Sequence, residues 1–318
     1  MIFSGIKVEG DIMVEEFKVK GDDGVSITVH KWADVENLRG SVLILHGMAE
    51  HSLRYDEFSR MLNDNGYVVY GCDHRGHGKT GTEYNQLGHF DENEWHKIVS
   101  DINNIIDYIK KENNKPLILL GHSMGSLLAR TCIQEFPDEF SAVILSGTTI
   151  GGNFVKRNMG YMISKIYASI YGYNKKAYLM DKLTFGNYNK SFYPNKTEFD
   201  WLSSDEDKVD KYTKDSLCGF ICSAGLYVNL LKAVNLTINK HNINKISKKL
   251  PVLILSGDND MVGSNSKDVV KLYNAYKKAG IENIELKIYE NGRHEMLNEL
   301  NRYEVYEDII RWIGNIEY

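Results

Sequence analysis

A short apolar run that ends in a glycine-flanked serine constrains the fold of this chain more than any other stretch. Residues 117–120 are Leu-Ile-Leu-Leu, and residues 121–125 are Gly-His-Ser-Met-Gly, before a helix-compatible segment. A serine in this pattern sits on a sharp strand-to-helix turn with its hydroxyl exposed above the sheet. The two glycines leave room, because a Cβ at either place would crowd the helix against the strand. Strand before and helix after therefore predict a nucleophile at Ser123.

The composition is that of an ordinary water-soluble globular chain. The 318 residues can bury a large core in one elaborated domain or two, and 42% are hydrophobic while 25% are charged. A formal net charge of -5 gives no reason to expect nucleic acid as a partner. The cysteines lack framework spacing, which indicates a reducing compartment, and acidic residues near the N-terminus (Glu9, Asp11, Glu15 and Glu16) interrupt any signal-peptide core. We therefore predict a cytoplasmic protein.

Short apolar runs alternate with helix-like segments along most of the chain. The predicted strands are residues 42–45, 67–70, 117–120, 142–145, 252–255 and 284–289, and the predicted helices are residues 56–63, 95–111, 125–135 and 266–278. Before them, residues 15–20 and 26–32 flank an acidic, glycine-containing turn, which indicates a hairpin. The pattern predicts an α/β fold: a doubly wound, mostly parallel sheet with an antiparallel hairpin at one edge.

One connection is much longer than the others. Residues 148–250 separate two predicted strands, and a structureless loop of this length would be unusual. Within it, residues 154–171 are apolar at helical spacing, residues 203–206 read as a capped helix start leading to Tyr212, and apolar residues from 217 to 231 predict a helix after Asp215. We expect residues 1–147 and 251–318 to form the core and residues 148–250 to form an inserted helical cap.

Reactive side chains follow three of the predicted strands, in the order serine, acid, histidine along the chain. In a doubly wound sheet, ligands bind beyond the carboxyl ends of the strands. Ser123 follows one strand, Asp258 and Asp260 follow a later one, and His294 follows the last. Serine, acid and histidine in this order are expected of the α/β-hydrolase arrangement, in which histidine activates the serine and the acid orients the histidine. Both aspartates are candidates for the acid.

Four motifs carry a resemblance to a known family. They are residues 46–55 (His-Gly-Met-Ala-Glu-His-Ser-Leu-Arg-Tyr), residues 73–78 (Asp-His-Arg-Gly-His-Gly), residues 121–125 and residues 292–295 (Gly-Arg-His-Glu). With them the chain resembles the monoglyceride lipase and lysophospholipase group of α/β-hydrolases, which is also grouped with serine aminopeptidase (S33) hydrolases. The resemblance extends from residue 15 to residue 312. Ala49 stands where the family usually has glycine, and Thr80 stands where it usually has serine.

The resemblance implies roles for further residues. The family pattern Gly-x-x-Asp selects Asp260 over Asp258, and the oxyanion donors would be the backbone N–H groups of Met48 and Met124. A polar group consisting of Glu50, Arg54, Tyr55 and, from the cap, Tyr212 would lie toward the alcohol end of the substrate. Stabilisation of the loop is the alternative role for this group.

The expected function is that of a serine carboxylic-ester hydrolase that cleaves a single-acyl lipid, a monoacylglycerol, through an acyl-enzyme intermediate. The alternatives are a lysophospholipase, a small-ester carboxylesterase or a serine peptidase of the same superfamily, and, from another class, a non-catalytic ligand-binding hydrolase fold. We expect a small lipid ester as the partner, with transient contact between the cap and a membrane or micelle surface; the oligomeric state is left open. No cofactor or metal is expected, because the serine chemistry requires none, and we expect the histidines at 46, 74, 77 and 122 to hold loops together.

Overall fold

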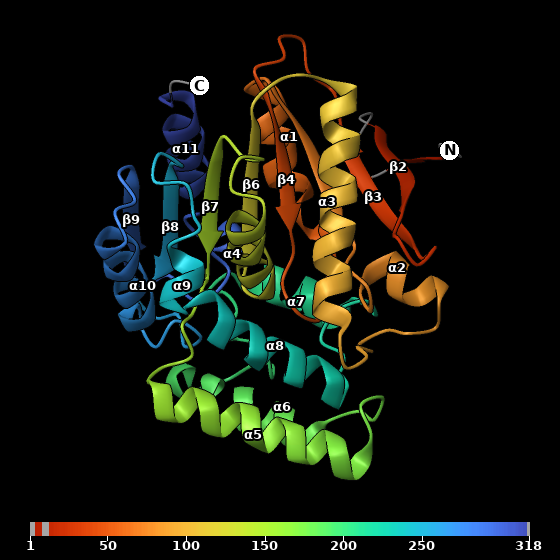
Figure 1. Ribbon diagram of the computed structural model, residues 1–318, viewed down its shortest axis with the longest axis vertical. Helices are drawn as coiled ribbons and strands as arrows, with labels where there is room; N and C mark the ends of the chain where they lie inside the picture. Colours follow the sequence, from red (N-terminus) through yellow and green to blue (C-terminus); the bar gives the residue numbers. More distant parts are fainter. Residues whose placement is uncertain (1–3, 8–12, 317–318) are drawn as a thin grey trace.

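The computed structural model describes residues 4–7 and 13–316, and its centre is one nine-stranded sheet (Figure 1). In spatial order the strands are β1-β2-β3-β5-β4-β6-β7-β8-β9. The first three pairings are antiparallel and the pairings from β5 to β9 are parallel. The strands are β1 (Ser4–Lys7), β2 (Met13–Lys20), β3 (Ser26–Trp32), β4 (Gly40–Leu45), β5 (Tyr67–Cys72), β6 (Leu117–His122), β7 (Ala142–Ser146), β8 (Val252–Gly257) and β9 (Ile284–Tyr289). The predicted parallel sheet and N-terminal hairpin are confirmed; Glu9 and Asp11 lie outside the described residues.

Helices cover both faces of the sheet, and this explains why the central strands are apolar throughout. Along β4, Leu43 and Leu45 pack into one core cluster with α3 (Glu94–Glu112), α4 (Met124–Glu135) and α10 (Lys267–Lys278). Val42 and Ile44 point the other way, into a cluster with α1 (Asp56–Asp64) and α11 (Arg302–Gly314). Successive side chains of a strand alternate between faces, so a strand buried on both faces must be apolar at every position.

The long connection between β7 and β8 is helical and lies beyond the carboxyl ends of the parallel strands (Figure 1). It holds α5 (Phe154–Tyr171), α6 (Tyr178–Phe185), η2 (Tyr188–Phe192), α7 (Glu206–Lys214), α8 (Ala224–Thr237) and α9 (Lys240–Ile243). Helix α8 lies between the sheet and α5, which is the helix farthest from the sheet (Figure 1). The division into a core and a cap domain stays a prediction, and the name cap is kept for residues 148–250.

One expectation about a helix in the cap is wrong, and several helices were not predicted. Residues 217–223 are not helical: Gly219 has a φ of +65°, and α8 begins only after Ser223, whose side chain accepts a hydrogen bond from the Leu226 N–H. Apolar residues of this stretch pack into two core clusters from an irregular turn. Helix α11 was not predicted, nor were α2 (Gly78–Glu83) and α6. In the part of the chain that the structure describes, no helix combines the length and apolar character needed to cross a membrane.

Candidate active site

Ser123 occupies a strained turn between β6 and α4. Its φ of +51° and ψ of −117° lie outside the regions that a side chain ordinarily allows, and such strain persists only when the surroundings enforce it. The flanking glycines are obligatory: a Cβ on Gly121 would come within 2.4 Å of the Gly125 carbonyl oxygen, and one on Gly125 within 1.9 Å of the Leu45 carbonyl oxygen. The close approach of α4 to β4 and β6 therefore sets the position of the Ser123 hydroxyl.

A hydrogen-bonded chain of serine, histidine and aspartate forms at the carboxyl edge of the sheet. The Ser123 Oγ lies 2.9 Å from the Nε2 of His294, and the His294 Nδ1 lies 2.9 Å from the Oδ1 of Asp260. His294 is 2% exposed and Asp260 is completely buried. With Nδ1–H donating to the carboxylate, Nε2 is free to accept the serine proton, which is the arrangement that an activated serine nucleophile needs.

Of the two candidate aspartates, the structure brings only Asp260 to the histidine. The Asp258 side chain instead accepts a hydrogen bond from the Asn259 side-chain amide at 3.0 Å. Its backbone N–H donates to the Tyr289 carbonyl, so Asp258 belongs to the turn that leaves β8. Asp260 also accepts from the Val262 N–H at 2.9 Å, which fixes its carboxylate toward His294.

The surroundings of His294 favour its protonated form. Burial by itself would lower the pKa of this imidazole, but the Asp260 carboxylate, in direct contact, raises it above the ordinary value. His122, whose ring centroid lies 4.8 Å from that of His294, responds in the opposite way. Burial and then the neighbouring His294 lower the pKa of His122 to about 4, so His122 stays neutral at pH 7.

The predicted oxyanion donors lie at the start of α4 and on the loop after β4. Met124 is the first residue of α4, where a backbone N–H has no intrahelical acceptor. Met48 belongs to the loop after β4, here called the oxyanion loop (residues 46–50). Glu50 shapes this loop, because its Oε1 accepts from the Gly47 N–H at 2.5 Å and from the Tyr55 hydroxyl at 3.0 Å. Ala49 has a φ of +55°, a conformation that favours the glycine usual at this position of the family.

The predicted substrate-binding group is bonded to itself, to the oxyanion loop and to Glu295. Arg54 donates to Glu50 at 2.5 Å and, through both terminal nitrogens, to Glu295 at 2.8 and 2.7 Å. Burial would raise the pKa of Glu50, but Arg54 lowers it to about 2. The Tyr212 hydroxyl donates to the Ala49 carbonyl at 2.9 Å, and the Arg54 guanidinium lies 4.7 Å from the Tyr212 ring centroid. These contacts hold the oxyanion loop, as the loop-stabilising alternative expects.

A cavity of about 460 Å³ opens at Ser123 and extends under the cap. Its size is typical of sites for small ligands. Ser123, His294, Met48, Glu50 and Tyr212 line it, whereas Arg54 and Tyr55 are not among its lining residues in the described part of the chain. The cap supplies an aromatic wall, made by Phe185, Phe199, Trp201, Tyr212 and Phe220.

Two residues at the site were missed by sequence reasoning. The Trp201 ring lies 5.3 Å from the His294 ring, between centroids, and stacks on Phe185 at 5.7 Å. No local spacing distinguishes this tryptophan from the other aromatic residues of the insertion. Glu295, the partner of Arg54, stands next to His294 in the motif at residues 292–295, but its contact spans 241 positions of sequence.

Of the four histidines expected to hold loops together, His46 and His77 bond loop backbone through their rings. His46 Nδ1 lies 2.7 Å from the Gly47 carbonyl and its Nε2 accepts from the His74 N–H, which defines one tautomer. His77 Nδ1 lies 3.0 Å from the Arg75 carbonyl. Burial lowers the pKa of all three imidazoles, so they are neutral at pH 7.

Comparisons with known proteins find a matching hydrolase family and relatives that are named for monoglyceride lipase activity. A model of the family described as serine aminopeptidase, S33, matches residues 36–301. A monoglyceride lipase homolog of Monkeypox virus is 30% identical over 290 residues, which cover 89% of this chain and 92% of the viral protein. The monoglyceride lipase of Homo sapiens is 28% identical, with 92% of this chain and 88% of the human protein covered.

Solved structures share the fold over almost the whole chain. A thermostable carboxyl esterase from Bacillus coagulans, solved in complex with glycerol, has a TM-score of 0.87 at 26% identity and covers 95% of this chain and 98% of its own. A monoglyceride lipase variant from Saccharomyces cerevisiae, solved with a substrate analog, has a TM-score of 0.74 at 21% identity and covers 98% of both chains. The yeast structure supports the common fold alone.

Proposed function

The chain belongs to the serine aminopeptidase S33 family and is an ester hydrolase with the α/β-hydrolase fold, and we propose that it cleaves monoacylglycerols into fatty acid and glycerol. The observation that carries the proposal is the hydrogen-bonded chain from Ser123 through His294 to Asp260, at the mouth of an aromatic-walled cavity. The names of the viral and human relatives support a glyceride as the substrate.

In the proposed reaction, Ser123 is the nucleophile and His294 the general base. The Ser123 Oγ attacks the acyl carbonyl carbon while its proton passes to His294 Nε2, and Asp260 stabilises the imidazolium. The N–H groups of Met48 and Met124 receive the developing oxyanion. Collapse of the tetrahedral intermediate breaks the ester C–O bond, and the departing glycerol takes the proton from His294. Water then attacks the acyl-serine by the same route and releases the fatty acid.

The charges around the cavity favour a neutral head group. A lysophospholipid brings a phosphate, which needs a cation that is not already paired. Arg54 is held by two carboxylates and does not line the cavity, so it offers little positive charge there. Among the described lining residues, one lysine, Lys182, stands against four carboxylates, which are Glu50, Asp181, Glu198 and Glu295. A phosphate in this cavity would therefore be repelled.

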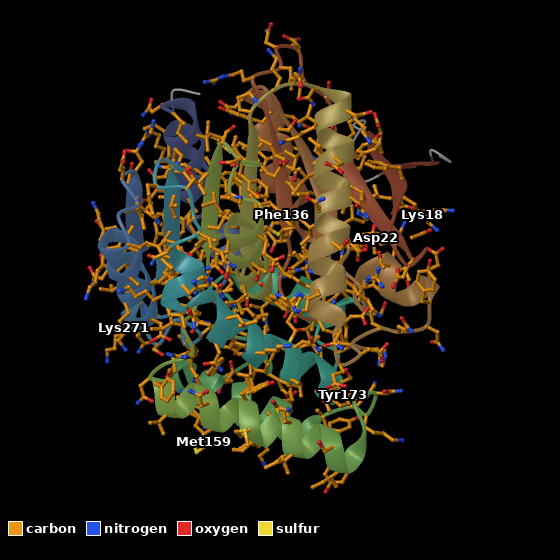
Figure 2. All side chains as sticks on the ribbon, viewed as in Figure 1. Lys18, Asp22, Phe136, Met159, Tyr173 and Lys271 are labelled. Carbon is orange, nitrogen blue, oxygen red and sulfur yellow. The ribbon has the colours of Figure 1, made fainter. Side chains whose placement is uncertain are left out.

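The cap presents a face suited to a lipid surface. The outer side of α5 carries large apolar side chains that are more than half exposed, among them Met159, Ile166 and Ile170. Met159 projects away from the sheet (Figure 2). A contiguous apolar face of this kind commonly marks an interaction site. We propose that it makes transient contact with the membrane or micelle from which the substrate is drawn.

A substrate panel tests the proposed function. The purified protein is assayed on a monoacylglycerol, on a lysophospholipid of the same acyl chain, on a short soluble ester and on an aminoacyl anilide, in one detergent. We expect the highest kcat/KM on the monoacylglycerol. A clear preference for the lysophospholipid or for the anilide would overturn the substrate and leave the mechanism standing.

The Ser123→Ala variant tests the mechanism. This change removes the nucleophile while the buried core stays intact, so we expect a folded protein with no ester hydrolysis above background and no labelling by a fluorophosphonate probe. Circular dichroism supplies the control for folding. Normal turnover by this variant would refute the serine mechanism, and an unlabelled, inactive wild-type protein would indicate the non-catalytic alternative.

A further inference from the structure

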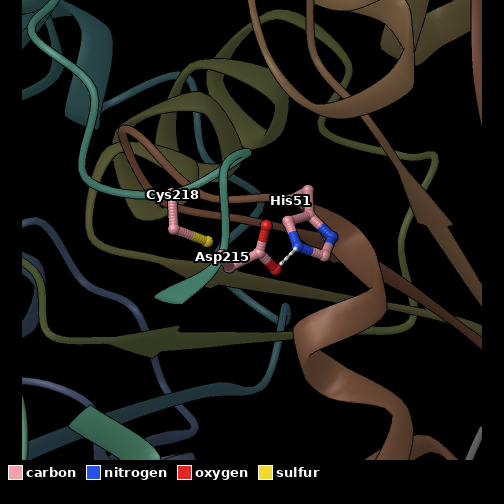
Figure 3. A group of neighbouring side chains, drawn as sticks. All are labelled: His51, Asp215 and Cys218. Carbon is pink, nitrogen blue, oxygen red and sulfur yellow. Dashed lines mark hydrogen bonds and ion pairs between the residues drawn. The ribbon is translucent and has the colours of Figure 1, made fainter. Parts of the chain in front are cut away.

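Three side chains with metal-binding atoms converge beside the oxyanion loop, outside the reaction centre. They are His51, which follows Glu50 directly, and Asp215 and Cys218, which follow α7 in the cap (Figure 3). The His51 Nε2 lies 2.9 Å from the Asp215 Oδ2, and the ligand atoms of all three residues lie within 4.8 Å of one another. In the described part of the chain, the residues that line the substrate cavity do not include any of the three.

Backbone hydrogen bonds hold this cluster, here called the His51 cluster, in place without help from a ligand. Asp215 Oδ1 accepts from the Leu217 N–H at 2.8 Å, and the Cys218 N–H donates to the Asp215 carbonyl at 3.0 Å. These two bonds turn the chain so that the Cys218 thiol faces the Asp215 carboxylate. The next residue, Gly219, donates to the Ala49 carbonyl at 3.0 Å, which fixes the turn against the loop that carries His51.

The donor set and its spacing suit zinc. Imidazole nitrogen, carboxylate oxygen and thiolate sulfur are the ligands that Zn²⁺ takes in proteins. Bond lengths of about 2.0 to 2.3 Å place the ligand atoms of a tetrahedral zinc site roughly 3.3 to 3.7 Å apart. His51 and Asp215 are already close, so the Cys218 sulfur has to approach by about an ångström or less. The Asp215 side chain is 33% exposed, which gives the ion an entry path and water access to the fourth position.

The local charge favours a dication. Arg54, whose charge acts on both Asp215 and Cys218, is bonded to Glu50 and Glu295, and Asp215 adds a third carboxylate. These three carboxylates and the guanidinium together carry two negative charges. His51 and Cys218 are only 7% and 8% exposed, so attraction to a cation is screened less than at the surface.

We propose that His51, Asp215 and Cys218 bind one Zn²⁺ ion that fastens the cap to the oxyanion loop and takes no part in ester cleavage. Binding releases the thiol proton of Cys218, and the thiolate, the imidazole and the carboxylate coordinate the ion, with water as the fourth ligand. Sequence spacing offers no signal for this site, because His51 and Asp215 are 164 positions apart.

Metal titration of the intact protein tests the site. The protein is freed of metal by dialysis against a chelator with a phosphine reductant and is titrated with Zn²⁺ by calorimetry and with Co²⁺ by absorption spectroscopy. We expect one Zn²⁺ per chain, a rise in melting temperature with Zn²⁺ concentration, and a thiolate-to-cobalt charge-transfer band. Absence of stoichiometric Zn²⁺ binding would overturn the proposal.

Matched variants assign the ligands. Cys218→Ser should abolish the charge-transfer band and weaken Zn²⁺ binding by more than tenfold. Loss of an outer-shell partner alone lowers metal affinity by about 10- to 100-fold, and loss of a direct ligand should lower it at least as much. Cys222→Ser is the control, because this buried thiol lies four positions further on and outside the cluster. If Cys218→Ser does not fold, Asp215→Asn takes its place, with weaker binding expected. Equal Zn²⁺ affinity in wild type and either ligand variant would refute the site.

Discussion

At the scale of single residues, two aspartates two positions apart have different environments and should respond differently to the same substitution. Asp260→Asn removes the carboxylate that fixes the His294 tautomer, and the loss of kcat should be about 10⁴-fold, as for an orienting aspartate elsewhere. Asp258→Asn changes a turn residue and should cost less than about tenfold, because a turn contact is outside the transition state. The measurement is kcat of both variants on a short soluble ester. A larger loss for Asp258→Asn than for Asp260→Asn would disprove the choice of Asp260 as the catalytic acid.

The acid limb of the pH–rate profile reports on His294. Burial acts to lower the pKa of this imidazole, but Asp260 raises it above its ordinary value of about 6.5. The general base must be neutral, so activity falls as the pH drops through this raised pKa, and the midpoint of kcat/KM should lie above pH 6.5. The measurement uses a soluble ester without ionising groups, from pH 5 to pH 9. Undiminished kcat/KM at pH 5 would contradict the proposed base.

Residues whose place follows from the alternation of strands and helices could be predicted from the sequence, and side-chain contacts without such a signal could not. Ser123 and His294 each follow a strand, so their position at one sheet edge follows from alternation of strands and helices. The choice of Asp260 needed the family pattern, since Asp258 also follows β8. The contact between Arg54 and Glu295 depends on the relative placement of segments 241 positions apart, which no local pattern encodes.

At the scale of elements, the outer face of α5 should determine how strongly the protein binds the lipid surface that holds its substrate. The double variant with Ile166→Ser and Ile170→Ser removes two side chains that are 54% and 67% exposed, so the fold should tolerate it. Each fully buried aliphatic side chain is worth about 1.5 to 3 kcal/mol, and partial insertion of two should change vesicle binding by roughly tenfold or more. Sedimentation with phosphatidylcholine vesicles measures the effect.

The control for the α5 variant lies on the edge strand β9, outside the cap. Ile288→Ser in β9 changes a side chain that is 41% exposed and belongs to the sheet, not to α5, so vesicle binding should be unchanged. Hydrolysis of a short soluble ester should stay normal in both proteins, because α5 is the helix farthest from the sheet. Equal vesicle binding by all three proteins would contradict a lipid-facing α5.

Strands and helices could be predicted where only one packing arrangement explains their pattern of apolar residues. Strands β4 to β8 are continuous apolar runs because helices cover both faces of the sheet, and a short run of this kind between turn residues is typical of a buried parallel strand. Apolar residues at intervals of three and four are less specific. Between residues 217 and 223 they pack into two core clusters from an irregular turn, where the positive φ of Gly219 prevents a helix. Helix α11 carries charged residues between its core contacts, which obscured its apolar stripe.

At the scale of the whole molecule, buried neutral histidines should make folding stability sensitive to acid. Burial lowers the pKa of His46 and His74, and it lowers the pKa of His77 to about 3 and of His122 to about 4. Between these values and the unfolded pKa of about 6.5, the unfolded chain binds protons that the native protein does not, so stability falls as the pH drops. For each such histidine, the free energy of unfolding can fall by about 1.4 kcal/mol per pH unit.

Urea titrations between pH 7.5 and pH 5 measure this effect on the wild-type protein. The four histidines with a lowered pKa outnumber His294, whose raised pKa acts in the opposite direction, so the unfolding midpoint should decline below about pH 6.5, before ordinary carboxylates titrate. The lowered pKa of Glu50 and Glu57, about 2 in each case, adds a further loss at lower pH, in the same direction. A midpoint that is constant down to pH 5 would show that these histidines are protonated in the native state.

The carbonyl oxygen of Ala49 accepts hydrogen bonds from two parts of the cap at once, the Tyr212 hydroxyl and the Gly219 N–H. Ala49 stands one residue beyond Met48, so any displacement of the cap that breaks these bonds also releases the segment proposed to cradle the oxyanion. Cap position and oxyanion geometry are thus coupled through a single carbonyl group: a substrate that displaced the cap to enter would also disturb the oxyanion loop, and cleavage would then require the cap to be back in its place.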